Sequence, residues 1–210
     1  MRKPARRTND PEGTRRNIVE VATREFAQKG YSGARVDAIA ERTRTSKRMI
    51  YYYFGSKEAL YLAVLEEAYS SVRRTEAALD LASLRPEAAL GTIVGFTFDY
   101  YNKHPEFVRL VMNENIMDGA HMARSKTISK LNVTVIDAMR RIVSRGQKER
   151  LFRPDIDPIE LHMSISALGI FSVANRATFS TIFKRDMVSP RALAARRQQV
   201  VEIILRHVRP

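Results

Sequence analysis

The sequence predicts an all-α fold of about nine helices, in which an N-terminal helix-turn-helix domain of three helices precedes a larger helical domain. Apolar residues recur at intervals of three and four along most of the 210 residues, the spacing that places them on one side of a helix. No stretch alternates apolar and polar residues for long enough to predict a strand. We therefore expect a basic flexible arm over residues 1–10, a helix-turn-helix domain over 11–55 and a second domain over 56–210.

One long helix and two short ones make up the expected N-terminal domain. A first helix is predicted over about 11–29 and is ended by Gly30, and a second carries apolar residues on one side over 36–40. Ser46 suits the N-cap of a third helix over 47–53, because its hydroxyl can accept a hydrogen bond from a free N–H group at the helix start. In a helix-turn-helix, the first turns of such a recognition helix meet base edges in the major groove.

An ordered set of residues in this region resembles a known family. Its members are Gly30, Tyr31, Ile39, Ala40, Tyr51, Phe54, Ser56, Lys57, Glu58 and Leu60. Over roughly residues 15–65, this pattern resembles the N-terminal domain of the tetracycline-repressor (TetR) family of bacterial transcription regulators. Two positions depart from the family pattern: Arg44 stands where a turn glycine is usual, and Ala34-Arg35 stands where a Thr or Ser usually caps the second helix. Arg44 is expected to strain the turn, since arginine tolerates positive φ less well than glycine.

The resemblance implies that the third helix and its surroundings bind DNA. Cations and phenols on so short a helix suit a polyanion with stackable, hydrogen-bonding edges, although an ordinary exposed helix face is the alternative. By resemblance, Tyr51 packs on the domain while its hydroxyl reaches a phosphate, and Lys57 adds charge to the positive end of the next helix dipole. The predicted DNA-binding residues are Arg35, Arg44, Thr45, Ser46, Lys47, Arg48, Tyr51, Tyr52 and Lys57.

Charge is distributed as expected for a nucleic-acid binder. The formal net charge is +13, and residues 1–60 contain 14 Lys and Arg against 7 Asp and Glu. Neutralisation of phosphates by such cations supplies most of the sequence-independent affinity for DNA. A solvated basic face would carry the same charge, so charge alone does not establish DNA binding. The arm over residues 1–10 either lies along DNA or stays a floppy tail.

Composition argues against several other classes of protein. Without cysteine there are no disulfides, no thiolate metal sites and no cysteine nucleophile. The basic N-terminus is not followed by an apolar segment, and no apolar run reaches membrane-spanning length, so we expect a soluble, cytoplasmic protein without a membrane partner. The four histidines are scattered, and neither a Gly-rich phosphate loop nor a nucleophile elbow occurs. We therefore expect neither an enzyme nor a cofactor.

Six further helices are expected in the second domain. They run from Ser56 to before Pro86, over 90–101, from Pro105, over 128–142 with Gly146 as the stop, from Pro158 to about Phe183, and from Pro190. The helix over 90–101 is apolar nearly all round, so it must be buried centrally or line a cavity. Pro105 ends it, because the residue before a proline is pushed out of the α region.

The resemblance also implies that the second domain senses a small molecule. Glu114, flanked by two asparagines and followed by His121, would supply the few polar groups of a mostly apolar pocket. The alternative is that the asparagines cap a helix end and that the methionines and aromatic residues fill the core. The predicted ligand-binding residues are Phe96, Tyr100, Phe107, Asn113, Glu114, Met117, His121, Phe171 and Asn175.

Small residues predict a close helix contact in the C-terminal part of the chain. Gly169 lies within a strong helical pattern, where it costs about 1 kcal/mol relative to Ala. The resemblance assigns dimerisation to the last two helices, while packing of the same helices within one chain is the alternative left open. The predicted dimer-interface residues are Leu161, Ile165, Leu168, Gly169, Ser172, Val200 and Ile204.

These observations together predict a ligand-responsive transcription regulator. We expect a homodimeric repressor that binds a palindromic operator of double-stranded DNA and is released by a small-molecule effector. A helical protein-binding adaptor and a small-molecule-binding enzyme are the alternatives, and the retained Tyr51, Lys57 and basic third helix argue against the adaptor. The sequence identifies neither the effector nor the operator.

Overall fold

The computed structural model describes residues 10–210, so residues 1–9 of the expected arm lie outside the described residues. The described residues form ten α-helices and one short 3₁₀ helix, without a strand. The all-α prediction is confirmed, with one α-helix more than expected. The helices are α1 (Pro11–Gly33), α2 (Val36–Thr43), α3 (Lys47–Phe54), α4 (Lys57–Ala77), α5 (Pro86–Lys103), α6 (Pro105–Ile116), η1 (Met122–Arg124), α7 (Lys126–Lys148), α8 (Pro158–Ala174), α9 (Arg176–Phe183) and α10 (Pro190–Val208).

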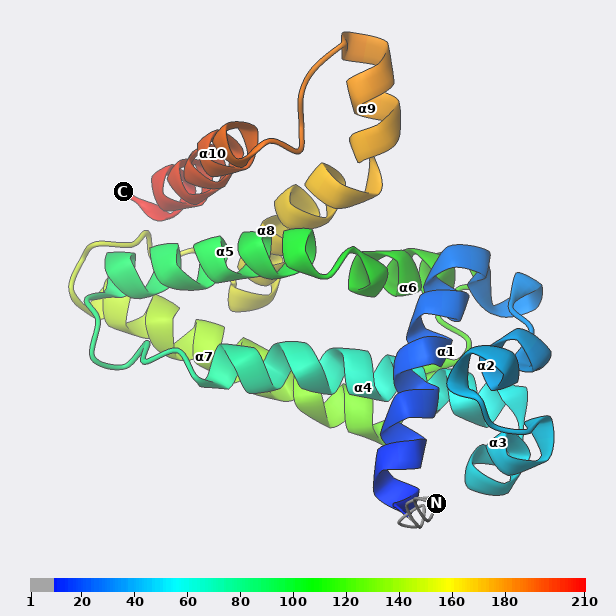
Figure 1. The fold of residues 1–210 in the computed structure, drawn as a ribbon. Coiled ribbons are helices and arrows are strands. Elements are labelled where there is room, and N and C mark those ends of the chain that lie inside the picture. Colours follow the sequence, from blue (N-terminus) through cyan, green and yellow to red (C-terminus); the bar gives the residue numbers. More distant parts are fainter. Residues whose placement is uncertain (1–9) are drawn as a thin grey trace, which may run out of the picture.

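The helices form two groups that share α4. Helices α1, α2 and α3 pack at one end of the molecule, and α5, α7, α8 and α10 make up the other (Figure 1). Helix α4 contacts α1 and α3 in the first group and α7 and α5 in the second. Helix α9 projects away from the body and buries none of its residues (Figure 1). A displacement of α4 would therefore change its packing contacts in both groups.

Serine and aspartate side chains begin the helices where the sequence predicted them. The hydroxyl of Ser46 accepts from the backbone N–H of Met49 at 3.2 Å, and that of Ser56 accepts from Ala59 at 3.0 Å. Asp157 caps α8 in the same way. The predicted break before Pro105 is also found, because α5 ends at Lys103. These boundaries depend on neighbouring residues only, which is why the sequence could give them.

The first core joins the helix-turn-helix to the rest of the chain. It contains apolar residues of α1, α2, α3 and the first half of α4, together with Leu110 of α6 and Ile128 of α7. Its fully buried members include Ile18, Phe26, Ile39, Ile50, Leu60, Tyr61 and Leu65. Because this core continues past residue 55, the division into 11–55 and 56–210 does not separate two cores, and it stays a prediction.

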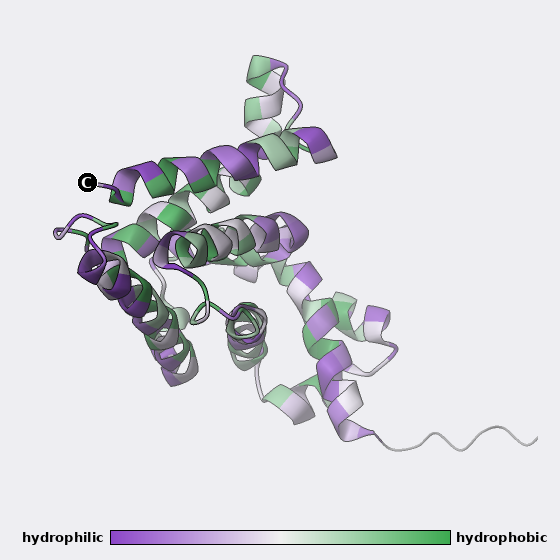
Figure 2. Ribbon diagram, turned by 90° about the vertical axis from the view of Figure 1, so that its left-hand side faces the viewer, coloured by the Kyte–Doolittle hydropathy of each residue, from purple (hydrophilic) through white to green (hydrophobic). Residues whose placement is uncertain are grey.

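The second core lies between α5, α7, α8 and α10. Its members include Leu90, Val94, Phe98, Met139, Ile142, Leu161, Ile165, Val200 and Ile204. Helix α7 illustrates how the sequence pattern builds it, since its hydrophobic residues lie along the inner side and its hydrophilic residues along the outer side (Figure 2). Within residues 10–210, no helix combines the length and the apolar character needed to cross a membrane.

Helix α1 continues to Gly33 across a kink at Gly30 (φ 66°, ψ 176°), where the sequence predicted its end. Two further boundaries differ from the prediction. Gly146 does not end α7, which continues to Lys148. A Cβ atom on Gly146 would lie 2.1 Å from the ring of Phe152, so the glycine makes room for that ring instead of stopping the helix. The chain turns later, at Arg150, whose φ is 56°. The physical reason is a packing contact that local sequence does not reveal.

The last difference is a break in the helix predicted from Pro158 to about Phe183. Asn175 (φ −99°, ψ 6°) interrupts it, so that α8 ends at Ala174 and a separate α9 follows. Just after the break, the guanidinium of Arg176 donates to the side chain of Asn102 on α5. This tertiary contact holds the start of α9 in a new direction.

Candidate nucleic-acid interface and effector site

The turn between α2 and α3 is tight and left-handed. Arg44 has φ 53° and ψ 34°, the conformation that glycine adopts more easily than arginine. The N–H of Thr45 donates to the carbonyl of Ala40 at 3.0 Å, and the N–H of Arg44 donates to Glu41 at 3.2 Å. The expected strain at Arg44 is therefore present, and backbone hydrogen bonds hold the turn in place.

Helix α3 has one buried side and one exposed side. Ile50 is 1% exposed and anchors the helix in the first core, whereas Tyr52 is 78% exposed. Arg48 and Lys47 are exposed in the first turn, and Tyr51 is partly exposed beside them. The exposed side therefore offers cations, hydroxyls and aromatic rings, which match phosphates and base edges.

The two cations of α3 differ in whether they form an ion pair. Lys47 forms an ion pair with Asp37 of α2 at 3.0 Å, a contact that the sequence did not suggest. For Arg48, no carboxylate within residues 10–210 forms an ion pair with the guanidinium. The exposed pair of Lys47 contributes little to stability, since such pairs are typically worth about 0 to 1 kcal/mol. A phosphate could therefore replace Asp37 at small cost.

The remaining predicted DNA-binding residues lie at the N-termini of α2 and α4 and in the turn. Arg35 is the exposed N-cap residue of α2, without a side-chain cap. The Nζ atom of Lys57 lies 4.9 Å from the ring centroid of Tyr31 and 3.5 Å from the carbonyl oxygen of Ser32. Burial lowers the pKa of Lys57 from its usual 10.5. Both helix N-termini carry the positive end of a helix dipole, which favours phosphate.

A buried carboxylate that the sequence analysis did not single out ties α1 to α2. Glu25 is completely buried and forms ion pairs with Lys29 and Arg42, each at 2.9 Å. It also accepts from the backbone N–H of Arg35 at 3.4 Å. Burial pushes its pKa up, but the bonds from Lys29 and Arg35 and the charges of Lys29 and Arg42 together hold the pKa below 4.5. The spacing of Glu25 and Lys29, one helical turn apart, was the only local signal of this site.

We expect Glu25→Gln to lower the free energy of unfolding at neutral pH and to lose this effect in acid. A carboxyl group whose folded pKa is below its unfolded value contributes stability above the unfolded value, and this contribution disappears as the pH falls through the folded pKa. The difference between parent and variant should therefore shrink below pH 4.5, the usual pKa of a glutamate. Urea unfolding between pH 3 and pH 7 measures it, with the exposed Glu20→Gln as a control. A difference that is independent of pH would contradict this assignment.

Three predicted ligand-binding residues form a packed joint between helices. Glu114 of α6 is 1% exposed and accepts from the backbone N–H groups of His121 at 3.2 Å and Met122 at 3.0 Å. Its other oxygen lies 2.9 Å from Nδ1 of His121. Asn113 donates to the backbone carbonyl of Phe26 in α1 at 3.2 Å. We call Asn113, Glu114 and His121, with the rings they contact, the α6 joint.

The α6 joint binds the segment after α6 to the helix-turn-helix. The ring of His121 lies 4.5 Å from that of Tyr31 in α1 and 4.9 Å from that of Tyr61 in α4, measured between centroids. Burial raises the pKa of Tyr61, and the nearby charge of Glu114 adds to the effect. Because both oxygens of Glu114 are used within the joint, the structure places Glu114 and His121 in a contact between helices and not in a pocket.

The other predicted ligand-binding residues do not converge on one pocket either. Phe96, Tyr100 and Phe107 pack in an apolar cluster, and the last two also border a groove of about 810 Å³ between α1 and α4. Phe171 borders a separate cavity of about 440 Å³ beside α10. Met117 follows the end of α6, and Asn175 separates α8 from α9. These two spaces do not bring the residues together, and a single pocket formed by these residues stays a prediction.

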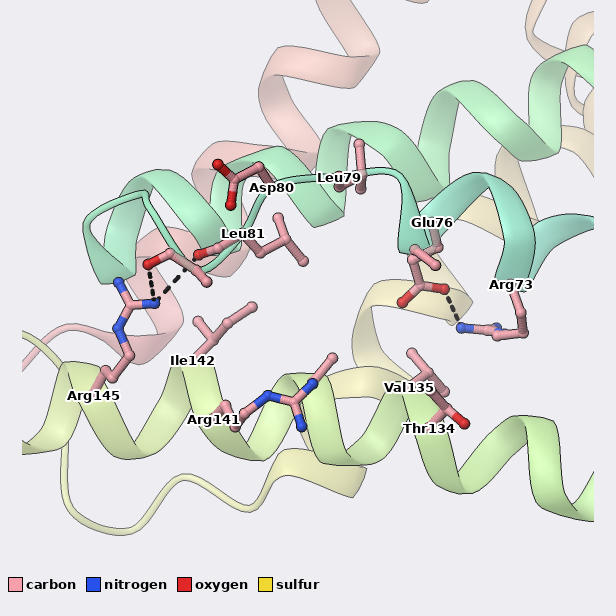
Figure 3. Close-up of a pocket in the computed structure, with 13 residues that line it drawn as sticks. Arg73, Glu76, Leu79, Asp80, Leu81, Thr134, Val135, Arg141, Ile142 and Arg145 are labelled. Carbon is pink, nitrogen blue, oxygen red and sulfur yellow. Dashed lines mark hydrogen bonds and ion pairs between the residues drawn. The ribbon is translucent and has the colours of Figure 1, made fainter.

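A cavity that the sequence did not predict lies between α4, the segment after it, and α7. Its volume is about 560 Å³ (Figure 3). Apolar side chains that form its walls include Leu79, Leu81, Val135, Ala138 and Ile142. Its charged side chains are Arg73, Glu76, Asp80, Arg141 and Arg145. Mostly apolar walls with a few convergent polar groups are typical of small-molecule sites.

An ion pair separates this cavity from a small chamber of about 10 Å³ in the domain interior. Arg73 and Glu76 pair with each other and line both spaces, and Tyr101 and His162 line the inner one. Burial, with the charge of Arg73, lowers the pKa of His162 to about 4, so the ring is neutral at pH 7. Burial raises the pKa of Glu76, and Arg73 opposes that shift. The sequence places Arg73 and Glu76 three residues apart on one helix, but it does not show that both residues line these two spaces.

The predicted dimer-interface residues are buried inside one chain. Leu161, Ile165, Gly169, Ser172, Val200 and Ile204 are all buried, and Leu168 is half-buried against the second core. A Cβ on Gly169 would lie 2.8 Å from the ring of Tyr101, so this glycine allows α8 to approach α5. These residues therefore pack within one chain, as the intramolecular alternative has it, and their role in a contact between two copies stays a prediction.

Known proteins match the whole length of this architecture. Residues 18–64 match the model of bacterial regulatory proteins of the tetR family, and residues 86–204 match the tetracyclin repressor-like C-terminal domain. The HTH-type transcriptional repressor NicS of Pseudomonas putida is 36% identical over 208 residues, which cover 99% of this chain and 98% of NicS. The HTH-type transcriptional regulator RutR of Escherichia coli is 30% identical over 157 residues, covering 71% of this chain and 69% of RutR.

Solved structures agree with this relationship. The transcriptional regulator SCO4942 from Streptomyces coelicolor is 28% identical with a TM-score of 0.71, and the alignment covers 94% of this chain and 99% of that one. A tetR-family regulatory protein from Rhodococcus RHA1 shares the fold with a TM-score of 0.73 at 22% identity, over 93% of this chain and 96% of that one. The helix-turn-helix, the helical second domain and these matches together establish that the chain belongs to the TetR family of bacterial transcription regulators.

Proposed function

We propose that this protein is a transcriptional repressor that binds a palindromic DNA operator as a homodimer in the cytoplasm and leaves it when a small molecule fills the cavity between α4 and α7. The observation that carries the proposal is the exposed side of α3, where Tyr52 is 78% exposed next to the cations of the first turn. An aromatic ring so exposed has no role in the core. The repressor name of the relative from Pseudomonas putida supports the sign of regulation.

DNA binding would use three helix N-termini of each chain. Helix α3 would enter the major groove, with Arg48 and Tyr52 reaching base edges or phosphates. The N-termini of α2 and α4, with Arg35 and Lys57, would meet the phosphates on either side. Phosphate contacts fix the orientation of the protein, whereas contacts to base edges give sequence specificity.

Dimerisation would use the outer sides of α8 and α10. Exposed apolar residues on these helices are Ile159, Met163, Phe171 and Ile203. They replace the buried residues predicted from the sequence as the candidate interface, because only exposed side chains can meet a second copy. A two-fold axis through this surface would pair the same residues of both chains and set two copies of α3 in fixed relation, as a palindromic operator requires.

Helix α4 would transmit the effect of ligand binding in the cavity to the DNA-binding helices. Arg73 and Glu76 lie near the C-terminal end of this helix and line the cavity, while Lys57 lies at its N-terminal end beside the DNA-binding face. A ligand that moves the C-terminal end would displace the other end as well. The groove of about 810 Å³ fits less well, because polar atoms make up a larger share of its exposed lining than they do in the cavity. Linkage requires that such a ligand also binds less tightly to the DNA complex.

To test this proposal, DNA sequences that bind the purified protein are selected from a random pool. The affinities of variants for the selected operator are then compared. We expect Lys47→Ala with Arg48→Ala to weaken operator binding at least about tenfold, or about 1.4 kcal/mol, without a change in melting temperature. Lys148→Ala with Arg150→Ala removes the same charge from exposed positions at the C-terminal end of α7 and just after it, and is the matched control. Equal affinities for parent and α3 variant across a salt titration would refute the assignment, and failure to select any sequence would favour a protein-binding adaptor.

A further inference from the structure

We propose that the ligand of the cavity between α4 and α7 is a small organic monoanion, with one carboxylate and an apolar body. The inference rests on the proposed function only in taking this ligand to be the effector. It concerns the cavity of about 560 Å³, whose size lies within the range of about 300 to 1,000 Å³ usual for small-molecule sites. Three observations support the inference: the charges around the cavity, the partners of those charges, and the apolar walls.

The cavity has an excess of positive charge. Three arginines line it, Arg73, Arg141 and Arg145, against two carboxylates, Glu76 and Asp80. Asp80 is exposed and accepts from the backbone N–H of Ser83 at 3.3 Å, and its carboxylate turns away from α7 (Figure 3). Glu76 is already paired with Arg73. With Asp80 turned away, three arginines face one carboxylate, so the cavity keeps an excess of positive charge. Backbone carbonyls hold Arg145, and within residues 10–210 only Arg141 of the three arginines has no bonded partner, which a single carboxylate would supply.

Arg141 is the arginine best suited to bind that anion. Its side chain runs along α7 on the α7 side of the cavity, whose lining it forms in part (Figure 3). No side chain among residues 10–210 forms an ion pair with it, so its donors are free. A planar guanidinium presents two parallel N–H groups, which match the two oxygens of a carboxylate.

The other two arginines of the cavity already have partners, Glu76 for Arg73 and backbone carbonyls for Arg145. Arg145 donates to the backbone carbonyls of Leu81 at 3.3 Å and Ala82 at 3.1 Å, and also to Leu84. These carbonyls hold the guanidinium in place but carry no net charge to neutralise it. The Nε of Arg73 is buried without a hydrogen-bond partner within the described part of the chain. Arg145 therefore adds to the attraction for an anion, whereas Glu76 balances the charge of Arg73.

The walls define the rest of the ligand. Leu79, Leu81, Val135 and Ile142 surround the arginines with apolar surface, which favours a hydrocarbon or aromatic body. A sugar or a second charge would lose hydration against these walls without gaining partners. The combination favours aromatic and short aliphatic monocarboxylates over neutral or polyanionic molecules.

The test compares carboxylates with their neutral amides on the whole protein. The probes are benzoate, phenylacetate, 1-naphthoate and hexanoate, each beside its primary amide, with dissociation constants measured by titration calorimetry. We expect at least one carboxylate to bind about tenfold or more tightly than its amide, a difference of about 1.4 kcal/mol. Arg141→Gln should remove this preference while leaving the melting temperature unchanged, since Arg141 is exposed and has no ion pair within residues 10–210.

The matched control is Arg140→Gln, the neighbouring residue on α7. Arg140 is exposed, pairs with Asp137 and does not line the cavity, so the variant loses the same charge at the same helix. Its carboxylate affinity should stay within about twofold of the parent. Equal affinity for acids and amides, equal loss in both variants, or no binding by any of the four carboxylates would each overturn the proposal.

Operator binding is measured separately, without any probe. If the operator is bound and only a neutral compound releases it, the carboxylate inference fails while the proposed function stands. If a carboxylate binds through Arg141 but no operator is bound, the ligand class stands and the proposed function fails. The two ideas are therefore tested by independent readouts.

Discussion

Met163→Asp combined with Ile203→Asp is expected to convert the protein into folded monomers and to weaken operator binding on the order of 100-fold or more. The side chains are 58% and 46% exposed, so the charges would face water in the free chain but would meet their own copies across a two-fold axis. A monomer presents one recognition helix, and loss of the second linked contact costs on the order of 10² to 10⁴ in affinity.

Sedimentation velocity and fluorescence anisotropy with labelled operator measure these two effects. Val133→Asp is the control, because Val133 is as exposed as Met163 but lies on α7, outside the proposed interface. Gly169 is unsuitable for this test, since a side chain there would collide with Tyr101 inside the chain and destabilise the fold itself. If the double variant sediments as an unchanged dimer, the interface lies on another surface.

Glu114→Ala is the second change with a large expected effect. It would leave the buried backbone N–H groups of His121 and Met122 without their acceptor. At about 1 to 3 kcal/mol for each of the two groups left unpaired, we expect the free energy of unfolding to fall by about 2 to 6 kcal/mol. Glu114→Gln keeps an acceptor oxygen of the same shape and should cost less.

The same position should affect communication between the domains. The α6 joint holds the segment after α6 against Tyr31 and Tyr61, which belong to α1 and α4. In Glu114→Gln, which is expected to stay folded, a ligand of the cavity should therefore bind with near-parental affinity but release DNA less effectively. Urea unfolding measures the loss of stability in Glu114→Ala. Operator affinity with and without ligand measures the release of DNA by Glu114→Gln. Parental stability in Glu114→Ala would mean that the joint does not hold these helices together.

Much of the backbone could be predicted from local patterns. The caps at Ser46, Ser56 and Asp157 and the break at Pro105 involve residues within a few positions of each other. The helix-turn-helix was predicted for the same reason, including a left-handed Arg44 in the turn. Helix periodicity also identified the buried sides of the helices, because the side chains that must leave water repeat with the helical turn.

The sites depended on contacts between distant segments. Arg73 and Arg141 share one cavity although they lie on different helices, and no local pattern relates them. Glu114 was singled out from the sequence, but its role changed once the structure placed His121 and Met122 against its oxygens. A polar cluster in sequence can form either a pocket or a packed joint, and the difference lies in which other helix covers it.

The sequence by itself determined the fold class, the helix-turn-helix and the sides of the helices that are buried. Only the tertiary structure decided what each buried side packs against: Gly146 accommodates Phe152, and Gly169 accommodates Tyr101 of the same chain. Local sequence sets the free energy of forming and ending a helix, because those contacts lie within one or two turns. The partner of an apolar surface is chosen by the shapes of all the helices together, since burial rewards contact with any apolar surface alike.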